Sequence, residues 1–441
     1  MPYNKNIGGD GYSYEILWEK DFAGGSGNMG AAVDSHDNVV VCGVNQGEDK
    51  GIVVKYDKNG KELWSDADLP GICNFFNTSE GATPVAPPAV KNILGREYGY
   101  FFDVAVDAED NIIVAGTFTE GGGTSSIMYV KKYDPDGNAI WERKYSPFQI
   151  NIASGIAVDG KGNIFVAGGG GSITSLLFKG VVLKISGLTG RIMWKSIRRK
   201  GMIAVYTGIT SDSQGNAIAA GFTGSGSEEN FDLTITKFGA LGGLRRREIT
   251  MAGNKVPTCI VYNPPGGEYI VAGKSGKDES HYLLKLGPYF NVLWEMGAEQ
   301  GTSKGFLYGA GITGEEIVTS GYLDGKKEYY AALHSLSTGK KLLDMFLGEC
   351  VTDHIDDYMR GVAVDSENNV IVTGARTIGK TMKIKIIQSA GGGGGGGGSG
   401  GGGGNSGEEG GGGAAGGGGG GGVHHLHESW LEKILRWIFG R

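Results

Sequence analysis

The chain has 441 residues, a net charge of −7 and 84 glycines, 25 of them between Gly391 and Gly422. An acidic chain is not expected to be a dedicated nucleic-acid binder, because affinity for phosphate backbones comes from Lys and Arg. The four cysteines, at positions 42, 73, 259 and 350, show no paired or metal-ligand spacing, which argues against a disulfide framework and a zinc site.

The N-terminal arm, residues 1–11, lacks the basic start and apolar run of a secretory signal. No stretch of the chain reaches the roughly 18 apolar residues that span a bilayer. We therefore expect a cytoplasmic protein, with peripheral membrane attachment as the alternative.

A repeated motif occupies residues 12–390. Its copies end at Gly43, Gly116, Gly168, Gly221, Gly273, Gly321 and Gly374, and after a first gap of 73 residues the spacing is 48 to 53. Each repeat contains two apolar strands joined by an Asp/Asn turn, followed by a second hairpin such as GIVVKYDKNGKELW. Four short strands per repeat at this period predict a β-propeller blade.

The seventh repeat enters polyglycine without its Trp-ending fourth strand. A matching strand, YEILWEKDF, lies at the other end of the chain. We therefore predict an all-β, seven-bladed β-propeller that residues 12–22 close by completing the last blade, which leaves no sheet edge open there.

The pattern A-x-D-x-x-G-N-x-x-V-x-G resembles the bacterial SBBP-type β-propeller repeat, and the GKELW hairpin ends resemble those of PQQ-like propellers. The resemblance covers about residues 12–388. These families share a fold and no common activity, so the resemblance implies a propeller and adds little about function. PQQ-like dehydrogenases would be exported and would use calcium, and neither is indicated; no cofactor is expected.

Two residue types recur at fixed places in the repeats. A Trp ends most fourth strands, with Leu244 and Leu343 in its place in two repeats, and we expect it to pack between neighbouring blades rather than to stack on a ligand. An Asp opens the first turn at positions 34, 107, 159, 212 and 365. Turn capping is the favoured role over calcium binding, because each Asp lacks carboxylate neighbours.

The long insert at residues 65–100 accounts for the wide first gap. Its proline-rich ATPVAPPAV is either a lid over one face or a long anchored loop. Phe75, Phe76 and Asn77 are the residues predicted to be exposed at its tip and to bind a small molecule or a partner.

Basic residues follow the outer strands of three consecutive repeats. If they share one edge, they form a cationic ridge for acidic protein, phosphate or anionic lipid; the alternative is a solvated outer edge that prevents strand pairing. The residues are Arg143, Lys144, Arg198, Arg199, Lys200, Arg245, Arg246 and Arg247.

Two groups of residues are weak metal candidates. One combines carboxylates with a histidine before the seventh repeat, and the other precedes the C-terminal helix. Solvated loop residues are the favoured interpretation of both, and no metal is predicted. The residues are Asp353, His354, Asp356 and Asp357, and then His424, His425 and His427.

The C-terminal part consists of a glycine-rich linker, residues 391–422, and an amphipathic helix, residues 423–441. The linker cannot bury enough side chain to fold alone. A helix of about three turns is marginal in water, so we expect it to fold only against an apolar surface: a membrane, a protein groove, its own propeller or the tails of other copies. Its apolar arc consists of Trp430, Leu431, Ile434, Leu435, Trp437, Ile438 and Phe439.

These features predict a non-catalytic propeller that acts as a binding or scaffolding module and is recruited by its tethered helix to a protein partner or a membrane. The alternative is an enzyme with an active site over the propeller channel, beneath the 65–100 insert. A buried, pH-sensitive carboxylate or a bound metal at that place would favour the enzyme.

Overall fold

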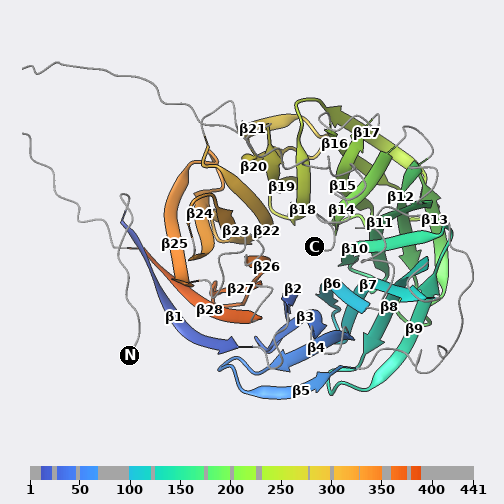
Figure 1. Ribbon diagram of the computed structural model, residues 1–441, viewed down its shortest axis with the longest axis horizontal. Coiled ribbons are helices and arrows are strands. Elements are labelled where there is room, and N and C mark those ends of the chain that lie inside the picture. Colours follow the sequence, from blue (N-terminus) through green and yellow to red (C-terminus); the bar gives the residue numbers. More distant parts are fainter. Residues whose placement is uncertain are drawn as a thin grey trace, which may run out of the picture. The chain divides into compact units, whose positions relative to one another are not determined.

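The structure is a computed structural model, and every strand it describes belongs to a β-propeller (Figure 1). The chain divides into two units, Met1–Gln388 and Ser389–Arg441, and the predicted linker and helix lie in the second, outside the described residues. The described residues are 11–21, 27–45, 50–67, 99–120, 125–172, 177–198, 203–224, 231–276, 279–297, 302–326, 328–349, 359–374 and 379–388.

Each of the first six sequence repeats supplies four antiparallel strands. The first holds β2 (Gly27–Val33), β3 (Val39–Asn45), β4 (Lys50–Tyr56) and β5 (Glu62–Asp66), and the second β6 (Gly99–Val106), β7 (Ile112–Glu120), β8 (Ser125–Tyr133) and β9 (Ala139–Tyr145). The third holds β10 (Ile150–Val158), β11 (Ile164–Ser172), β12 (Leu177–Ile185) and β13 (Ile192–Ile197), and the fourth β14 (Ile203–Ser211), β15 (Ala217–Gly224), β16 (Phe231–Phe238) and β17 (Arg245–Met251). The fifth holds β18 (Val256–Asn263), β19 (Glu268–Ser275), β20 (Ser280–Leu286) and β21 (Val292–Met296), and the sixth β22 (Gly305–Thr313), β23 (Glu316–Leu323), β24 (Glu328–Ser335) and β25 (Lys341–Glu349).

The last sheet combines the two ends of the propeller. It contains β26 (Met359–Val364), β27 (Val370–Gly374) and β28 (Lys380–Gln388) from the seventh repeat, and β1 (Tyr12–Asp21) from the N-terminus. β1 pairs antiparallel with β28, from Tyr12 opposite Gln388 to Asp21 opposite Lys380. The third and fourth repeats join into one larger sheet through a single parallel pair, Phe178 with Ile203.

A β-bulge interrupts the innermost strand of every repeat. The register with the second strand shifts by one residue, which leaves a residue of the inner strand unpaired. These bulge residues are Met29, Phe102, Ser154, Thr207, Thr258, Tyr308 and Arg360.

The bulge explains the glycine that ends the repeated motif. A carbonyl of the inner strand turns toward the second strand, and a Cβ at Gly168 would lie 1.8 Å from the carbonyl oxygen of Ile152. The corresponding gap is 1.9 Å at Gly116 and 2.0 Å at Gly321. A side chain therefore cannot fit at this position unless the backbone moves.

Replacing Gly168 by Ala should destabilise the propeller by about 1–3 kcal/mol, the usual cost of overpacking a dense core. Gly160→Ala is the matched control, because a Cβ there would meet nothing within 4 Å. Denaturant unfolding of both variants checks the prediction. Equal stability of Gly168→Ala and Gly160→Ala would show that the inner strand tolerates a side chain.

A buried ion pair ties the first turn of five repeats to the third strand. In the third repeat, Asp159 accepts hydrogen bonds from the backbone N–H groups of Lys161 and Asn163, and its Oδ2 lies 3.0 Å from the Nζ of Lys184. Burial raises the pKa of Asp159, but the bonds from Asn163 and Lys184 outweigh it and leave the pKa below its usual value. The predicted turn capping is confirmed. The other pairs are Asp34–Lys55, Asp107–Lys132, Asp212–Lys237 and Asp365–Lys383.

The predicted packing of the tryptophans between repeats is also confirmed. Trp141 Nε1 and Lys132 Nζ both donate to the carbonyl oxygen of Gly187, in the outer turn of the following repeat, each at 3.0 Å. The ring of Trp141 lies against Gly190, whose φ of 66° favours glycine. Trp18, Trp64, Trp194 and Trp294 make the same kind of bond.

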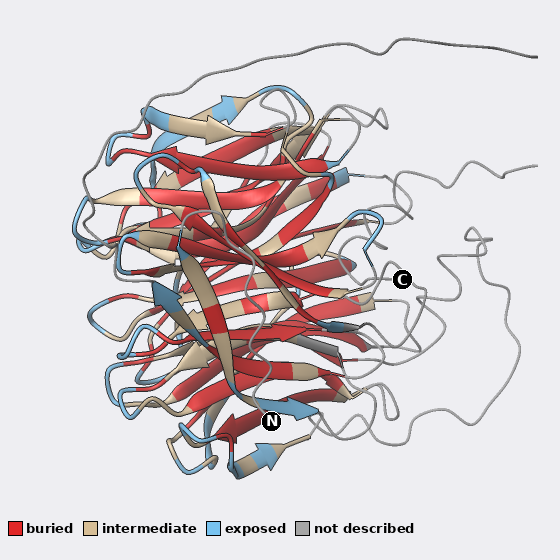
Figure 2. Cartoon of the chain, turned by 90° about the vertical axis from the view of Figure 1, so that its left-hand side faces the viewer, coloured by how far each residue is buried: buried red, intermediate tan, exposed pale blue. Residues whose placement is uncertain are grey.

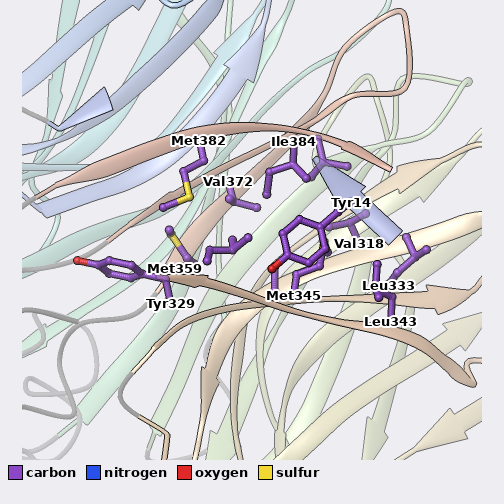
Figure 3. Close-up of a cluster of buried hydrophobic side chains, with 13 residues drawn as sticks. Tyr14, Val318, Tyr329, Leu333, Leu343, Met345, Met359, Val372, Met382 and Ile384 are labelled. Carbon is purple, nitrogen blue, oxygen red and sulfur yellow. The ribbon is translucent and has the colours of Figure 1, made fainter. Parts of the chain in front are cut away.

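The two leucines predicted to replace Trp behave differently. Leu343 is buried in a cluster that joins the sixth repeat to the last sheet and includes Tyr14 of β1 (Figure 3). The prediction for Leu244 is wrong, because this residue is exposed. Arg247 lies opposite Lys237 there, at the position that Trp64 takes opposite Lys55 in the first repeat.

Candidate functional site

The innermost strands of all seven repeats lie around the propeller axis (Figure 1). Their residues line a cavity of about 220 Å³. β2, β6, β10, β14, β18, β22 and β26 each contribute lining residues, and all seven bulge residues are among them. Because a bulge redirects a side chain, the same backbone feature presents chemically varied groups around the channel. This channel is the candidate functional site.

Three bulge residues use their hydroxyl groups to join neighbouring inner strands. Ser154 Oγ donates to the carbonyl oxygen of Tyr206 at 2.6 Å. Thr207 Oγ1 donates to Pro257 at 2.7 Å, and Thr258 Oγ1 donates to Leu307 at 2.8 Å. These hydrogen bonds hold neighbouring inner strands together in the channel wall.

The other four bulge residues, Met29, Phe102, Tyr308 and Arg360, have large side chains. Phe102 stacks with Tyr100 at 6.0 Å between ring centroids, and Tyr308 stacks with Phe306 at 4.6 Å. The guanidinium carbon of Arg360 lies 5.1 Å from the centre of the Tyr308 ring, in a cation–π arrangement. This part of the channel offers aromatic faces, a thioether and a positive charge.

The position after the bulge is glycine in five repeats, and the exceptions are Asp103 and Cys259. Glycine fits because neighbouring inner strands touch here: a Cβ at Gly208 would lie 2.8 Å from the Cα of Cys259. Asp103 instead bridges to the next strand, accepting from its own neighbour Val104 N–H and from Ile156 N–H, each at 2.9 Å.

The two exceptions are the titratable groups with shifted pKa values in the channel wall. Burial raises the pKa of Asp103 to about 7, although its two backbone hydrogen bonds act in the opposite direction. Burial also raises the pKa of Cys259 to about 12, so its thiol stays protonated and is a poor nucleophile. Within the described channel wall, Cys259 therefore does not supply a thiolate for Asp103 to work with.

A second cavity, also of about 220 Å³, lies between the fifth and sixth repeats and is lined by His281 and His334. His334 takes the place of larger or apolar residues at the equivalent strand position of the other repeats, among them Tyr56 and Phe238. Burial lowers the pKa of each imidazole to about 4, so both are neutral near pH 7. No sequence feature singled out this pair.

Of the predicted basic residues that the structure describes, one is removed from the surface. Arg198 is buried and pairs with Glu248, and it also donates to Thr234 Oγ1. Arg143 Nε donates to the carbonyl oxygen of Gly190, while Lys144, Arg245, Arg246 and Arg247 are exposed. The remaining predicted site residues lie outside the described residues: Arg199 and Lys200, Phe75, Phe76 and Asn77, Asp353, His354, Asp356 and Asp357, His424, His425 and His427, and the apolar arc Trp430, Leu431, Ile434, Leu435, Trp437, Ile438 and Phe439.

Asp34, His36 and Asp110 form the one group of potential metal ligands in the part of the chain that the structure describes. Their oxygens already have partners: Asp34 Oδ2 lies 2.9 Å from Lys55 Nζ, and both Asp110 oxygens accept from Ser35. The group is therefore explained as a link between two turns.

The bulge residues were missed by the sequence analysis, although a signal exists. They precede the repeated segment in MGAAVD, FDVAVD, SGIAVD, TGITSD, TCIVYN, YGAGIT and RGVAVD, where the first residue varies and glycine usually follows. A variable residue beside a repeated glycine could have marked the channel.

Comparison with known proteins supports the fold. No family model matches the chain. Over 135 residues it is 30% identical to the uncharacterized WD repeat-containing protein L264 of Acanthamoeba polyphaga mimivirus, and this match covers 26% of the chain and only 9% of that protein. Within the described residues, no helix is long and apolar enough to cross a membrane.

Two solved propellers are similar in structure. The WD40 β-propeller domain of Doa1 matches with a TM-score of 0.53 and 12% identity, over 84% of this chain and 97% of that one. The Dos1 propeller matches with a TM-score of 0.47 and 11% identity, over 81% and 77%. The SBBP-type resemblance stays a prediction, and the chain is an all-β propeller with WD40-like structural neighbours.

Proposed function

We propose that this chain is a non-catalytic, seven-bladed β-propeller scaffold that binds a protein partner at the mouth of its central channel. The proposal includes the tethered helix: residues 423–441, on the glycine linker 391–422, recruit the propeller to a protein partner or a membrane surface. WD40-like propellers commonly bind proteins, which supports the general part of this proposal.

The count of seven blades is supported by the inner strands. Seven strands line the channel, each with a bulge at the equivalent position. The larger sheet then counts as two blades, because one residue pair alone joins β12 to β14. β1 supplies the fourth strand of the last blade.

The variety of the bulge residues is the observation that carries the binding function. A purely structural channel would need only residues that join the strands, as Ser154, Thr207 and Thr258 do. Phe102, Tyr308 and Arg360 differ from these, and aromatic residues and arginine are the side chains that dominate binding energy at protein interfaces.

The enzyme alternative is favoured by one observation, the pKa of Asp103 near neutrality. However, each oxygen of this carboxylate accepts a backbone N–H from within the wall, and the nearby thiol of Cys259 stays protonated. Asp103 is better explained as a bridge between the second and third repeats.

A capture experiment tests the proposal. Immobilised full-length protein is compared with Phe102→Ala/Arg360→Ala and with a control, Leu63→Ser, which changes an exposed residue of outer strand β5. We expect at least one protein to bind the wild type and the control and to bind the channel variant at least tenfold more weakly, since interface hot spots cost about 2 kcal/mol or more. Equal capture by all three proteins would contradict the channel assignment.

Removing residues 423–441 should abolish recruitment and leave the melting temperature of the propeller unchanged.

A further inference from the structure

The outer turns of the third, fourth and fifth repeats carry exposed apolar residues at their tips. Leu188 is 87% exposed, Leu241 97% and Tyr289 72%, and Leu244 beside Leu241 is 69% exposed. The corresponding turn of the second repeat holds Asp134 and Asp136 instead. We propose that this turn-tip patch, Leu188, Leu241, Leu244 and Tyr289, with the basic residues around it, binds the surface of an anionic lipid bilayer.

The tips lie on one face of the propeller. Each is in the turn between the third and fourth strands of its repeat, β12–β13, β16–β17 and β20–β21. Antiparallel order places these turns at the same end of the sheets as the first turns, and Figure 2 shows exposed turns along one side of the ring. Successive repeats are neighbours in the ring (Figure 1), so the three tips follow one another in a row along this face.

Positive charge lies beside the Leu188, Leu241 and Leu244 part of this row, although the chain as a whole is acidic; the described part of the fifth repeat, which holds Tyr289, has three Lys and three Glu. The described residues of the third and fourth repeats contain ten Lys and Arg but only four Asp and Glu. Two of the acids, Asp159 and Asp212, are buried beside lysines, and Glu248 pairs with Arg198. The basic residues nearest the tips by position in the turns are Arg191, Arg245, Arg246 and Arg247, and Arg143 reaches the turn of Leu188 through its bond to Gly190.

The preceding repeat holds two of the turns rigidly. Lys132 and Trp141 both bond to the carbonyl of Gly187, beside Leu188. Lys184 and Trp194 both bond to the carbonyl of Ala240, beside Leu241. These two tips are therefore presented without further ordering of the backbone, which lowers the entropy cost of binding.

A bilayer fits this surface better than a protein groove does. The tips protrude, and none of them lines either of the two cavities described above. Protruding apolar residues flanked by Lys and Arg are the pattern of interfacial attachment, in which the apolar groups enter the headgroup region and the cations attract anionic lipid. An acidic protein is the competing occupant and is an outcome of the test.

Vesicle co-sedimentation of the full-length protein tests this inference separately from the channel. The vesicles are phosphatidylcholine alone and phosphatidylcholine with phosphatidylserine. The parent protein carries Trp430→Ser, Ile434→Ser and Trp437→Ser, which removes the predicted contribution of the tail. The patch variants are Leu188→Ser/Leu241→Ser/Tyr289→Ser and Arg245→Gln/Arg246→Gln/Arg247→Gln, and the matched control is Lys58→Gln/Lys61→Gln in the outer turn of the first repeat.

The parent should bind only the anionic vesicles, and more weakly as salt rises. Each arginine contributes about fivefold to partitioning, so the arginine variant should lose roughly a hundredfold, while the lysine control stays unchanged. The apolar variant should also lose binding. If the parent does not sediment with anionic vesicles, or if the patch variants bind like the control, the inference is wrong. A third outcome is that the parent does not bind vesicles but binds an acidic protein that the patch variants fail to bind. That result would assign the surface to the protein instead of the bilayer.

Discussion

The free energy of unfolding of the wild type should fall as the pH drops from 6.5 to 4. Replacing His334 with Phe should make that fall about 3 kcal/mol smaller. Burial is the main cause that lowers the folded-state pKa of His334 from 6.5 to about 4. Above pH 6.5 the imidazole is neutral in both states. Between the two values only the unfolded chain binds the proton, so stability falls as pH falls; a shift of about 2.5 pKa units corresponds to about 3 kcal/mol.

The test compares the pH dependence of the free energy of unfolding in the variant with that in the wild type, because other groups also contribute to each curve. His281, which lines the same cavity and has a pKa of about 4, adds a slope of the same sign. The pKa of Asp103, raised to about 7 from 3.8, gives the opposite sign: its contribution is present below pH 3.8 and is lost as pH rises to 7. Both groups remain in the variant, so their own contributions cancel in the difference. His281 also lowers the pKa of His334, so the difference reports His334 together with its interaction with His281. Lys341 and Asp344 also act on the histidine and remain in place.

Denaturant unfolding at several pH values measures this difference. Phe is the natural choice because Phe238 holds the equivalent position in the fourth repeat, and the larger ring fills part of the cavity. The control is His36→Gln, at a largely exposed histidine. If His334→Phe and wild type lose stability in parallel on acidification, the buried histidine is not the source of the slope.

Replacing Lys184 with Met should destabilise the propeller by about 3–5 kcal/mol. Lys184 and Asp159 are both buried, and removing the ammonium leaves the carboxylate without its positive partner. The change also removes the hydrogen bond from Nζ to the carbonyl of Ala240, which links the third repeat to the fourth. One substitution therefore weakens both a turn and a contact between repeats.

Two further variants make this test specific. Lys161→Met, at an exposed lysine of the same turn, should change stability by less than about 0.5 kcal/mol. Asp159→Asn/Lys184→Met should recover part of the loss, because the buried charge is gone and Asn263 already occupies the equivalent turn of the fifth repeat. If Lys184→Met unfolds at the same denaturant concentration as Lys161→Met, the ion pair contributes nothing net.

The sequence by itself determined the repeated strands, the turns and the roles of their recurring residues. These features depend on neighbours within one repeat: an Asp two and four residues before the N–H groups it accepts from, or a glycine opposite a bulge. Periodicity also identified the pairing partner of β28, because a strand missing at one end of the repeat series was present at the other.

Only the tertiary structure decided which side chains meet. Ser154 bonds to Tyr206, and Asp103 bonds to Ile156, each about one repeat away along the chain, so no local pattern shows the contact. Arg198 was grouped in the sequence with the basic residues expected at the surface but is buried beside Glu248, because the following repeat covers it. The channel and the histidine cavity exist because separate repeats pack against one another, and their chemistry depends on the residues that packing brings together.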